Sequence, residues 1–295
     1  MSDNGMNSAT TNVYLNGEYL PLEQAKISVL DRGFLFGDGV YEVIPVYAGR
    51  LFRLEQHMAR LDRSLEAILM QNPFSHAEWQ AILNRLLPTD ASADFSVYLQ
   101  ITRGAAQKRD HSFPPKLKAT TFAMTCPAAQ PTDLIAQGAS AITLPDIRWH
   151  LCHVKAIALL GNVLLRQQAV EVGAAEAILI RGGCAYEGAA SNLFTVKDGL
   201  LTTPPNSSLL LPGVTRDLVI ELAQAHGISL RLADVPESDL AEADEIWLTS
   251  STKEVIPVTR LNDKPIGAGV PGPVWHRIRG LFEDYKEQIR AGEVL

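Results

Sequence analysis

The chain has 295 residues, 46% of them hydrophobic and 20% charged, a composition that excludes an intrinsically disordered protein and predicts a buried core. Its length corresponds to one very large domain or two ordinary ones. With 26 Lys and Arg residues against 33 Asp and Glu residues, the formal net charge is −7 and no basic block occurs, so we expect no nucleic-acid partner and no membrane partner.

The cysteines and the N-terminus predict a cellular compartment. Cys126, Cys152 and Cys184 are widely spaced and form neither a CxxC motif nor a ligand spacing typical of zinc, so we expect no disulfide scaffold and no metal. Residues 1–12 are polar and lack the apolar segment of a signal peptide, and no run approaches the roughly 18 apolar residues of a membrane span. These features predict a cytoplasmic protein that acts on small molecules.

The N-terminal part of the chain contains two hairpin signals. Asn16-Gly17 separates two short apolar runs, and both residues tolerate positive φ, which is typical of a two-residue hairpin turn. A second hairpin is predicted at residues 40–52, where β-branched and aromatic side chains flank Ala48-Gly49. The elements predicted beyond it are helices at 54–69 and 75–87 and strands at 95–102 and 116–124.

A linker and a second domain are predicted next. Two prolines within residues 126–131 oppose a regular strand ladder, so we place a boundary there, between a domain at 1–125 and a domain at 132–295. The mixture of meandering strands and helices predicts the α+β class. The elements predicted for the second domain are a helix at 157–171, a strand at 177–180, a hairpin of 193–196 with 200–203, a helix at 215–226, a strand at 245–249 and a helix at 274–290.

Three segments offer side chains for chemistry. Lys155 lies in the apolar segment 151–160, where burial favours the neutral amine that attacks a carbonyl carbon to form a Schiff base. The alternative is a lysine whose head group extends from a helix into solvent. Glu187, in a loop of small residues, is either a functional acid or a solvated turn residue. Arg109 and His111 form either a grip for a carboxylate or a solvated basic loop.

Two further segments offer groups that bind anions. Gly213 precedes a predicted helix, so the amides of Val214 and Thr215 would point toward an anion at the helix N-terminus. Residues 250–252, Ser-Ser-Thr, follow a predicted strand and form a second hydroxyl-rich site. A helix cap and a surface turn explain these two patterns equally well.

Ordered motifs along the chain resemble the class IV pyridoxal-phosphate aminotransferases. The similarity extends from about residue 13 to the final helix, and it is closest to the D-amino acid aminotransferases of this class, because Tyr41, Arg109 and His111 match their grip on the substrate carboxylate. The motifs that carry the resemblance are Asp31-Arg32-Gly33-Phe34-Leu35-Phe36-Gly37-Asp38-Gly39-Val40-Tyr41-Glu42, His57-Met58-Ala59-Arg60-Leu61, Lys155, Glu187-Gly188, Ser191-Asn192, Gly213-Val214-Thr215-Arg216 and Ser250-Ser251-Thr252.

The resemblance implies a fold, a cofactor and a reaction. The implied fold is fold type IV, with a small α+β N-terminal domain joined to a larger pseudo-barrel α+β domain. The implied cofactor is pyridoxal 5′-phosphate. The implied reaction is a ping-pong transamination of D-amino acids, in which D-alanine and 2-oxoglutarate give pyruvate and D-glutamate.

The resemblance also implies roles for individual residues. Lys155 would form the internal aldimine and shuttle a proton, and Glu187 would keep the pyridine nitrogen protonated. Arg109 and His111 would reach across a homodimer to bind the substrate together with Tyr41. The residues implied to hold the rest of the cofactor are Leu211 at the ring and Arg60, Val214, Thr215, Ser251 and Thr252 at the phosphate.

Departures from the family pattern and alternative functions remain at this point. Ala189-Ala190 replace serines, the loop 104–111 is one residue longer, and His153 replaces an acid. A branched-chain L-aminotransferase would have the same fold with a different carboxylate site, and an aminodeoxychorismate lyase would need no 2-oxo acid. A cofactor-carrying protein without turnover would need no carboxylate grip at all.

Overall fold

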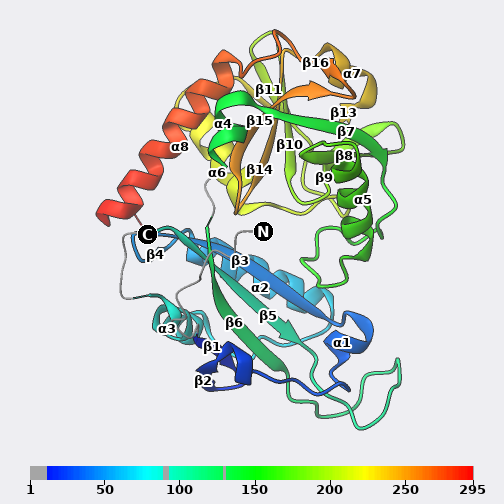
Figure 1. The fold of residues 1–295 in the computed structure, drawn as a ribbon, viewed down its shortest axis with the longest axis vertical. Coiled ribbons are helices and arrows are strands. Elements are labelled where there is room, and N and C mark those ends of the chain that lie inside the picture. Colours follow the sequence, from blue (N-terminus) through cyan, green and yellow to red (C-terminus); the bar gives the residue numbers. More distant parts are fainter. Residues whose placement is uncertain (1–11, 89–92, 129–130, 295) are drawn as a thin grey trace, which may run out of the picture.

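The computed structural model describes residues 12–88, 93–128 and 131–294 and contains two β-sheets, one above the other in Figure 1. The N-terminal part is built on a six-stranded sheet and the C-terminal part on a ten-stranded sheet. Helices accompany both sheets, which confirms the predicted α+β class. Within the described ranges, every helix is too short or too polar to cross a membrane.

The N-terminal sheet is antiparallel throughout, in the order β2-β1-β6-β5-β3-β4. Helices α2 and α3 bury apolar side chains against it, among them Met58, Leu61 and Trp79. The elements of this part are β1 (Asn12–Leu15), β2 (Glu18–Pro21), η1 (Leu22–Gln24), α1 (Arg32–Phe36), β3 (Gly39–Tyr47), β4 (Arg50–Leu51), α2 (Leu54–Ala67), α3 (His76–Leu86), β5 (Phe95–Thr102) and β6 (Thr120–Pro127).

Local signals in this part of the sequence are confirmed. Asn16 and Gly17 form the turn between β1 and β2 at φ angles of 55° and 105°. The second predicted hairpin is formed by β3 and β4. Ser75 accepts a hydrogen bond from the backbone of Glu78, whose side chain binds the Ser75 amide in return, and this capping box begins α3. These elements therefore follow from short-range sequence patterns.

Strand β6 differs from the prediction at both ends. It begins at Thr120 instead of residue 116, and it continues through Pro127, although the prolines of this segment predicted an irregular linker from residue 126. Pro127 pairs with Phe95 as the last residue of the strand, where a missing N–H disturbs a ladder least. The predicted linker also includes residues 129–130, which lie outside the described residues.

Six strands of the C-terminal sheet close into a barrel. The sheet order is β12-β11-β10-β14-β15-β7-β8-β9-β13, and an additional pairing joins β9 to β10, so the strands from β10 to β9 form a ring. The residue pair at this closure is Asn192 with Glu187. The strands are β7 (Ala139–Pro145), β8 (Glu176–Arg181), β9 (Cys184–Gly188), β10 (Asn192–Lys197), β11 (Leu200–Thr203), β12 (Leu230–Leu232), β13 (Val235–Pro236), β14 (Glu245–Ser250), β15 (Glu254–Leu261) and β16 (Lys264–Pro265).

Helices cover the barrel and connect it to the N-terminal sheet. Helix α8 runs down to the level of β4 in Figure 1, and the ring of Phe282 lies 6.1 Å from the ring of Phe52, which follows β4. Phe194 and Trp247 of the barrel belong to the same apolar cluster. The helices of this part are α4 (Thr132–Gln137), α5 (Leu160–Glu171), α6 (Val214–Ala225), α7 (Glu237–Glu242) and α8 (Pro273–Ala291).

The segment before α5 crosses from the barrel to the N-terminal sheet. Tyr41 N donates to Lys155 O at 2.9 Å, and Ile157 N donates to Gly39 O at 3.1 Å. These bonds hold the backbone of residues 155–157 against β3 and outside a helix, and α5 begins three residues after the helix start predicted at 157. The crossing fixes the backbone of Lys155 at the junction of the two parts.

Candidate active site

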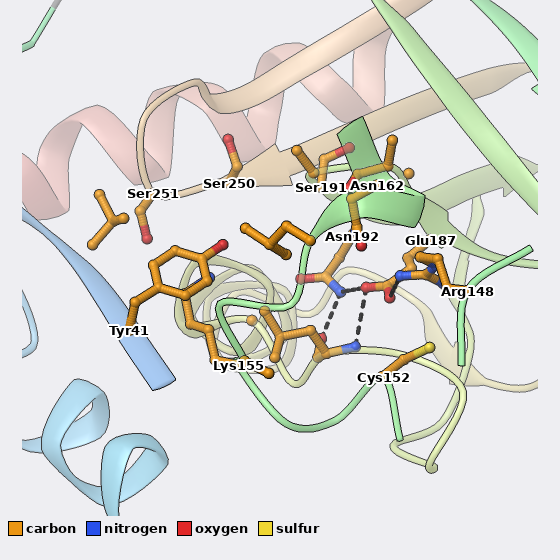
Figure 2. A pocket seen from close by; sticks show the side chains of 18 of the residues that line it. Tyr41, Arg148, Cys152, Lys155, Asn162, Glu187, Ser191, Asn192, Ser250 and Ser251 are labelled. Carbon is orange, nitrogen blue, oxygen red and sulfur yellow. Dashed lines mark hydrogen bonds and ion pairs between the residues drawn. The ribbon is translucent and has the colours of Figure 1, made fainter. Parts of the chain in front are cut away.

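A cavity of about 490 Å³ is lined by residues of both parts of the chain, a volume typical of a site for small molecules. In Figure 2, Tyr41 and Lys155 lie on one side of this cavity and Glu187 with Arg148 on the other. Arg109 and His111 are the predicted site residues that do not line it. The predicted site residues that do line it are Tyr41, Arg60, Lys155, Glu187, Leu211, Val214, Thr215, Ser251 and Thr252.

Lys155 presents its amine beside an aromatic ring. It lies between turns and bends and outside any helix, so the alternative of a lysine extending from a helix is wrong. Its backbone N donates to Ser64 Oγ at 3.1 Å, and its Nζ lies 4.3 Å from the centre of the Tyr41 ring. A half-buried amine on a fixed backbone meets the geometric requirement of a lysine nucleophile.

Glu187 lies in strand β9 at the closure of the barrel, not in the loop that the small residues predicted. Its Oε1 accepts from Arg148 Nη1 at 2.6 Å. Its Oε2 accepts from Leu211 N at 3.0 Å and from Asn192 Nδ2 at 3.2 Å. Burial raises the pKa of Glu187 to about 7, although the charge of Arg148 opposes this rise. Glu187 can therefore hold or release a proton near neutral pH.

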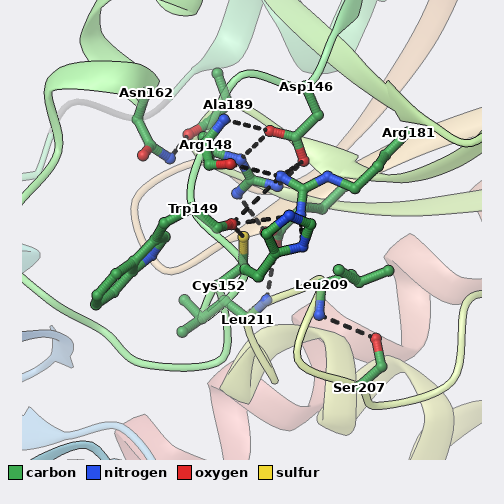
Figure 3. Close-up of polar contacts among 12 residues, drawn as sticks. Asp146, Arg148, Trp149, Cys152, Asn162, Arg181, Ala189, Ser207, Leu209 and Leu211 are labelled. Atoms are coloured by element: carbon green, nitrogen blue, oxygen red, sulfur yellow. Dashed lines mark hydrogen bonds and ion pairs between the residues drawn. The ribbon is translucent and has the colours of Figure 1, made fainter. Parts of the chain in front are cut away.

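Arg148 and Asp146 complete this cluster, and no sequence pattern singled them out. Asp146 accepts from Arg148 Nε and from Arg148 Nη2, each at 2.9 Å. Arg181 Nη2 lies 3.0 Å from Asp146 Oδ2, the oxygen that Arg148 Nη2 also binds. Figure 3 shows both arginines beside this carboxylate. Charges of alternating sign thus extend from Glu187 through Arg148 and Asp146 to Arg181. Arg148 and Glu187 are separated by 39 positions, so only the fold brings them together.

One end of the cavity is suited to an anion. Helix α6 begins at Val214 without a side-chain cap, so its first N–H groups are available to a ligand. A Cβ atom at Gly213 would lie 1.9 Å from Asn192 Oδ1, which explains why glycine precedes this helix. Ser251 and Thr252 line the same cavity from the turn after β14. The helix N-terminus and the hydroxyls therefore line one cavity.

Arg60 lines the cavity but is also part of a buried ion pair. It donates from Nε and Nη2 to Glu42 at 2.8 and 2.6 Å, and from Nη1 to Pro212 O at 3.1 Å. Burial alone would raise the pKa of Glu42, but the charge of Arg60 lowers it to about 2. His57 Nδ1 lies 2.8 Å from the same carboxylate. Arg60 keeps part of its five-donor capacity for a ligand.

The structure places Arg109 and His111 together but outside the cavity of their own chain. Both lie against Phe36 of α1, with the Arg109 guanidinium carbon 4.9 Å and the His111 ring 5.1 Å from the centre of the Phe36 ring. Both side chains are exposed. They form one surface group on the N-terminal part.

Two of the departures from the family pattern lie near the cavity. Ala189 and Ala190 line it, and Asn162 Nδ2 donates to Ala189 O at 2.7 Å. His153 Nδ1 is buried and has no hydrogen-bond partner among the described residues. Nothing in the structure assigns His153 a function.

The family of the protein follows from a comparison with family models. Residues 39–261, which include the crossing segment and most of the barrel, match the model "Amino-transferase class IV". The chain therefore belongs to the class IV aminotransferases.

Individual relatives and solved structures agree with this class. The D-alanine aminotransferase of Bacillus licheniformis is 40% identical over 272 residues, which cover 92% of this chain and 96% of that enzyme. The D-alanine aminotransferase of Staphylococcus epidermidis is 38% identical over 276 residues, which cover 93% and 98%. The structure of the branched-chain amino acid aminotransferase of Escherichia coli matches with a TM-score of 0.87 and 27% identity, over 93% of this chain and 94% of that one.

A further solved structure was determined with a cofactor derivative. It is the T.th. branched-chain amino acid aminotransferase complexed with N-(5′-phosphopyridoxyl)-L-glutamate. It matches with a TM-score of 0.85 and 27% identity, over 97% of this chain and 95% of that one.

Proposed function

We propose that the protein is a pyridoxal-phosphate-dependent aminotransferase of D-amino acids, which converts D-alanine and 2-oxoglutarate to pyruvate and D-glutamate. The observation that carries the proposal is that Lys155, Glu187 and the N-terminus of α6 line one cavity. The identity of 38–40% to two D-alanine aminotransferases, over more than nine-tenths of the chain, supports the choice of substrate.

The groups in the cavity fit pyridoxal phosphate. Val214, Thr215, Ser251 and Thr252 supply amides and hydroxyls for the phosphate, with Arg60 beside them. Thr249 Oγ1 is buried at the cavity wall and has no hydrogen-bond partner among the described residues. Because buried polar atoms in proteins are normally paired, a bound ligand is the expected partner of this hydroxyl. Leu211 provides an apolar contact for the ring.

The protein supplies a nucleophile, a base and a proton holder. When bound, the cofactor supplies an aldehyde that reacts with amines and a ring that accepts the electron pair released at Cα of the amino acid. Lys155 Nζ is the nucleophile, and it also takes the proton from Cα and returns it. The Glu187 carboxyl group holds a proton at the pyridine nitrogen. Tyr41 orients the lysine through the contact between its ring and Nζ.

Selection of one enantiomer requires a fixed carboxylate site. When both the amine and the carboxylate of an amino acid are held, only one enantiomer directs its Cα hydrogen toward Lys155. We assign the carboxylate to Tyr41, Arg109 and His111. Because Arg109 and His111 lie outside the cavity of their own chain, they serve the cavity of a second copy in a homodimer.

Exposed apolar side chains near the cavity support this homodimer. On α5, Leu160, Val163 and Leu164 are 72%, 58% and 48% exposed, and Val163 also lines the cavity. Apolar groups in such a patch are typical of a protein interface. We expect Leu160→Glu to sediment as a monomer without activity, whereas Leu232→Glu, on the edge strand β12, sediments as the dimer. A dimeric, active Leu160→Glu enzyme would exclude this face as the interface.

The proposed function is tested by a paired assay. The purified protein is given pyridoxal phosphate and 2-oxoglutarate, with D-alanine in one reaction and L-alanine or L-leucine in another. We expect 2-oxo acid product from D-alanine alone. Turnover of L-leucine alone would favour a branched-chain aminotransferase, and no turnover of either with bound cofactor would favour a lyase.

The lysine is tested separately from the substrate. Lys155→Ala should abolish turnover and the covalent attachment of the cofactor, detected by mass spectrometry after borohydride reduction. Lys264→Ala, an exposed lysine of β16, is the matched control and should keep both properties. A fully active Lys155→Ala enzyme would exclude the proposed mechanism. We also propose a cytoplasmic location, which the three unpaired cysteines Cys126, Cys152 and Cys184 support.

A further inference from the structure

We propose that Arg32 is a positioning residue for substrate binding, because it fixes the loop 104–112 that carries Arg109 and His111. Arg32 does not line the cavity. The inference rests on the proposed function, which assigns the substrate carboxylate to Arg109 and His111. It adds the residue that gives these two side chains a defined place.

Arg32 binds the tip of the loop through three consecutive carbonyl groups. Its Nη1 donates to Asp110 O at 2.6 Å and to Ser112 O at 3.2 Å, and its Nη2 donates to His111 O at 3.1 Å. The Arg32 side chain is only 4% exposed. A guanidinium group offers five N–H donors in one plane, whereas the lysine ammonium group has three donors around a single atom. The arrangement therefore depends on arginine.

Asp38 fixes the guanidinium group from the other side. Arg32 Nε donates to Asp38 Oδ2 at 2.7 Å, and the Asp38 side chain is 12% exposed. Asp38 also accepts from Arg103 Nε at 2.9 Å. Arg103, however, directs its other nitrogens to the carbonyls of Ile68 and Leu69, away from the loop. Arg103 stacks on the ring of Phe113, directly after the loop, with its guanidinium carbon 3.7 Å from the ring centre. Of the two arginines that bind Asp38, Arg32 is therefore the one that hydrogen-bonds to the backbone of the loop tip.

The backbone next to Arg32 binds the stem of the same loop. Arg32 N donates to Gly104 O at 2.9 Å, and Ala106 N donates to Leu30 O at 3.2 Å. Asp31 forms an isolated β-bridge with Ala105. Residues 30–32 thus bind the loop both at its stem and, through the Arg32 side chain, at its tip.

Helix α1, which begins with Arg32, also positions Arg109 and His111, the residues proposed to bind the substrate carboxylate. Phe36 follows Arg32 by one turn of α1, and the Arg32 guanidinium carbon lies 4.9 Å from the centre of its ring. Arg109 and His111 lie against this ring as well. Arg32 binds the backbone of His111, and Phe36 contacts the side chains of Arg109 and His111. The Arg109 guanidinium group and the His111 ring are therefore held on the same aromatic ring.

Loss of Arg32 should weaken substrate binding without affecting the cofactor. The loop would lose three charge-assisted hydrogen bonds and would be less ordered in the free enzyme. Substrate binding would then have to order the loop, and the entropy cost of this ordering would weaken binding. Since the carboxylate is held equally in the ground state and in the transition state, we expect KM to rise more than kcat falls.

The experiment compares Arg32→Met and Arg32→Lys with the matched variant Arg103→Met, all as holoenzymes. We expect both Arg32 variants to raise KM for D-alanine and 2-oxoglutarate by at least about tenfold, the factor for the loss of a single charged hydrogen bond. Amide hydrogen exchange in residues 104–112 should become faster in both, while the cofactor content stays that of the wild type. Arg103→Met keeps all three bonds to the loop and should leave KM unchanged.

Arg32→Lys retains the buried positive charge and its partner Asp38, so it tests the role of the guanidinium shape even if Arg32→Met does not fold. Unchanged KM or unchanged loop exchange in the folded Arg32 variants would overturn the proposal. Arg109→Ala distinguishes this result from failure of the proposed function. If Arg109→Ala leaves KM unchanged, the carboxylate assignment fails; if it raises KM and the Arg32 variants do not, only the positioning role fails.

Discussion

Arg148 and Glu187 are joined by a hydrogen bond of 2.6 Å between Nη1 and Oε1, and their side chains are only 6% and 5% exposed. The same guanidinium group binds Asp146 through Nε and Nη2. The positive charge of Arg148 is thus shared between two acids. It stabilises the Glu187 anion less than it would if Glu187 were its only partner. This sharing explains how a carboxyl group beside an arginine has its pKa raised to about 7 by burial.

The first prediction concerns this shared charge. Arg148→Met should raise the pKa of Glu187 further, because burial then acts without the opposing cation and the charge of Asp146 adds to the effect. The measurement is infrared difference spectroscopy of the cofactor-free protein across a pH series, with Glu187→Gln identifying the carboxyl band. Arg148→Lys, which retains a cation, is the control and should change the pKa less. A lower pKa in Arg148→Met would contradict this account.

The second prediction concerns the stability of the cofactor-free protein. The folded-state pKa of Glu187, about 7, is above the usual value of 4.5. The stabilisation from its protonation is therefore complete below pH 4.5 and is lost as the pH rises through about 7. Urea unfolding measures the free energy of unfolding of the wild type minus that of Glu187→Gln. This difference should fall between pH 4.5 and about pH 7, by at most about 1.4 kcal/mol for each pH unit. A difference that does not depend on pH would show that Glu187 is ionised throughout.

The third prediction has the opposite sign and concerns Glu42. Its pKa in the folded protein is about 2, so its stabilising contribution is complete above pH 4.5 and is lost as the pH falls toward 2. Glu42→Gln should lack this acid dependence and should lose about 3 kcal/mol of stability at pH 7, because it leaves Arg60 buried without its anion.

An exposed pair provides the control for Glu42. Lys197 Nζ lies 3.4 Å from Asp244 Oδ1, and the two side chains are 56% and 49% exposed. Because exposed ion pairs contribute little, Lys197→Gln should cost less than about 1 kcal/mol. Equal losses in the two variants would mean that burial does not decide the strength of these pairs.

The elements that the sequence predicted correctly depend on short-range patterns. The Asn16-Gly17 turn, the helix predicted at 75–87 and the bounds of β5 are all encoded in short segments of the sequence. The order of the strands around the barrel is not, because β15 pairs in parallel with β7, far away in the chain, and no local pattern specifies that register. The small residues around Glu187 predict a loop, whereas the structure has a strand there, β9, which forms a hairpin with β8 and also pairs with the distant β13.

The site shows the same division. Motifs marked Lys155, Glu187 and the N-terminus of α6, and the fold brings these residues to one cavity. Arg148 changes the pKa of Glu187, and Glu42 neutralises the charge of Arg60. Each of these pairs joins two separate elements of the fold, so the spacing of the residues in the sequence does not indicate it. The chemical types of the reacting groups could therefore be predicted from the sequence. The charged partners that set the ionisation of these groups could be identified only from the structure.

The last prediction concerns the unpartnered hydroxyl at the cavity wall. Thr249 is 1% exposed, and its Oγ1 has no hydrogen-bond partner among the described residues. Thr249→Val has nearly the same shape without the hydroxyl, so the cofactor-free protein should unfold at an equal or higher urea concentration. If the bound cofactor is the hydrogen-bond partner of Thr249 Oγ1, the dissociation constant of the cofactor should be about tenfold higher in Thr249→Val than in the wild type. This factor corresponds to about 1.4 kcal/mol. Equilibrium dialysis measures this constant, and an unchanged value combined with raised stability would show that the hydroxyl faces the cavity without binding the cofactor.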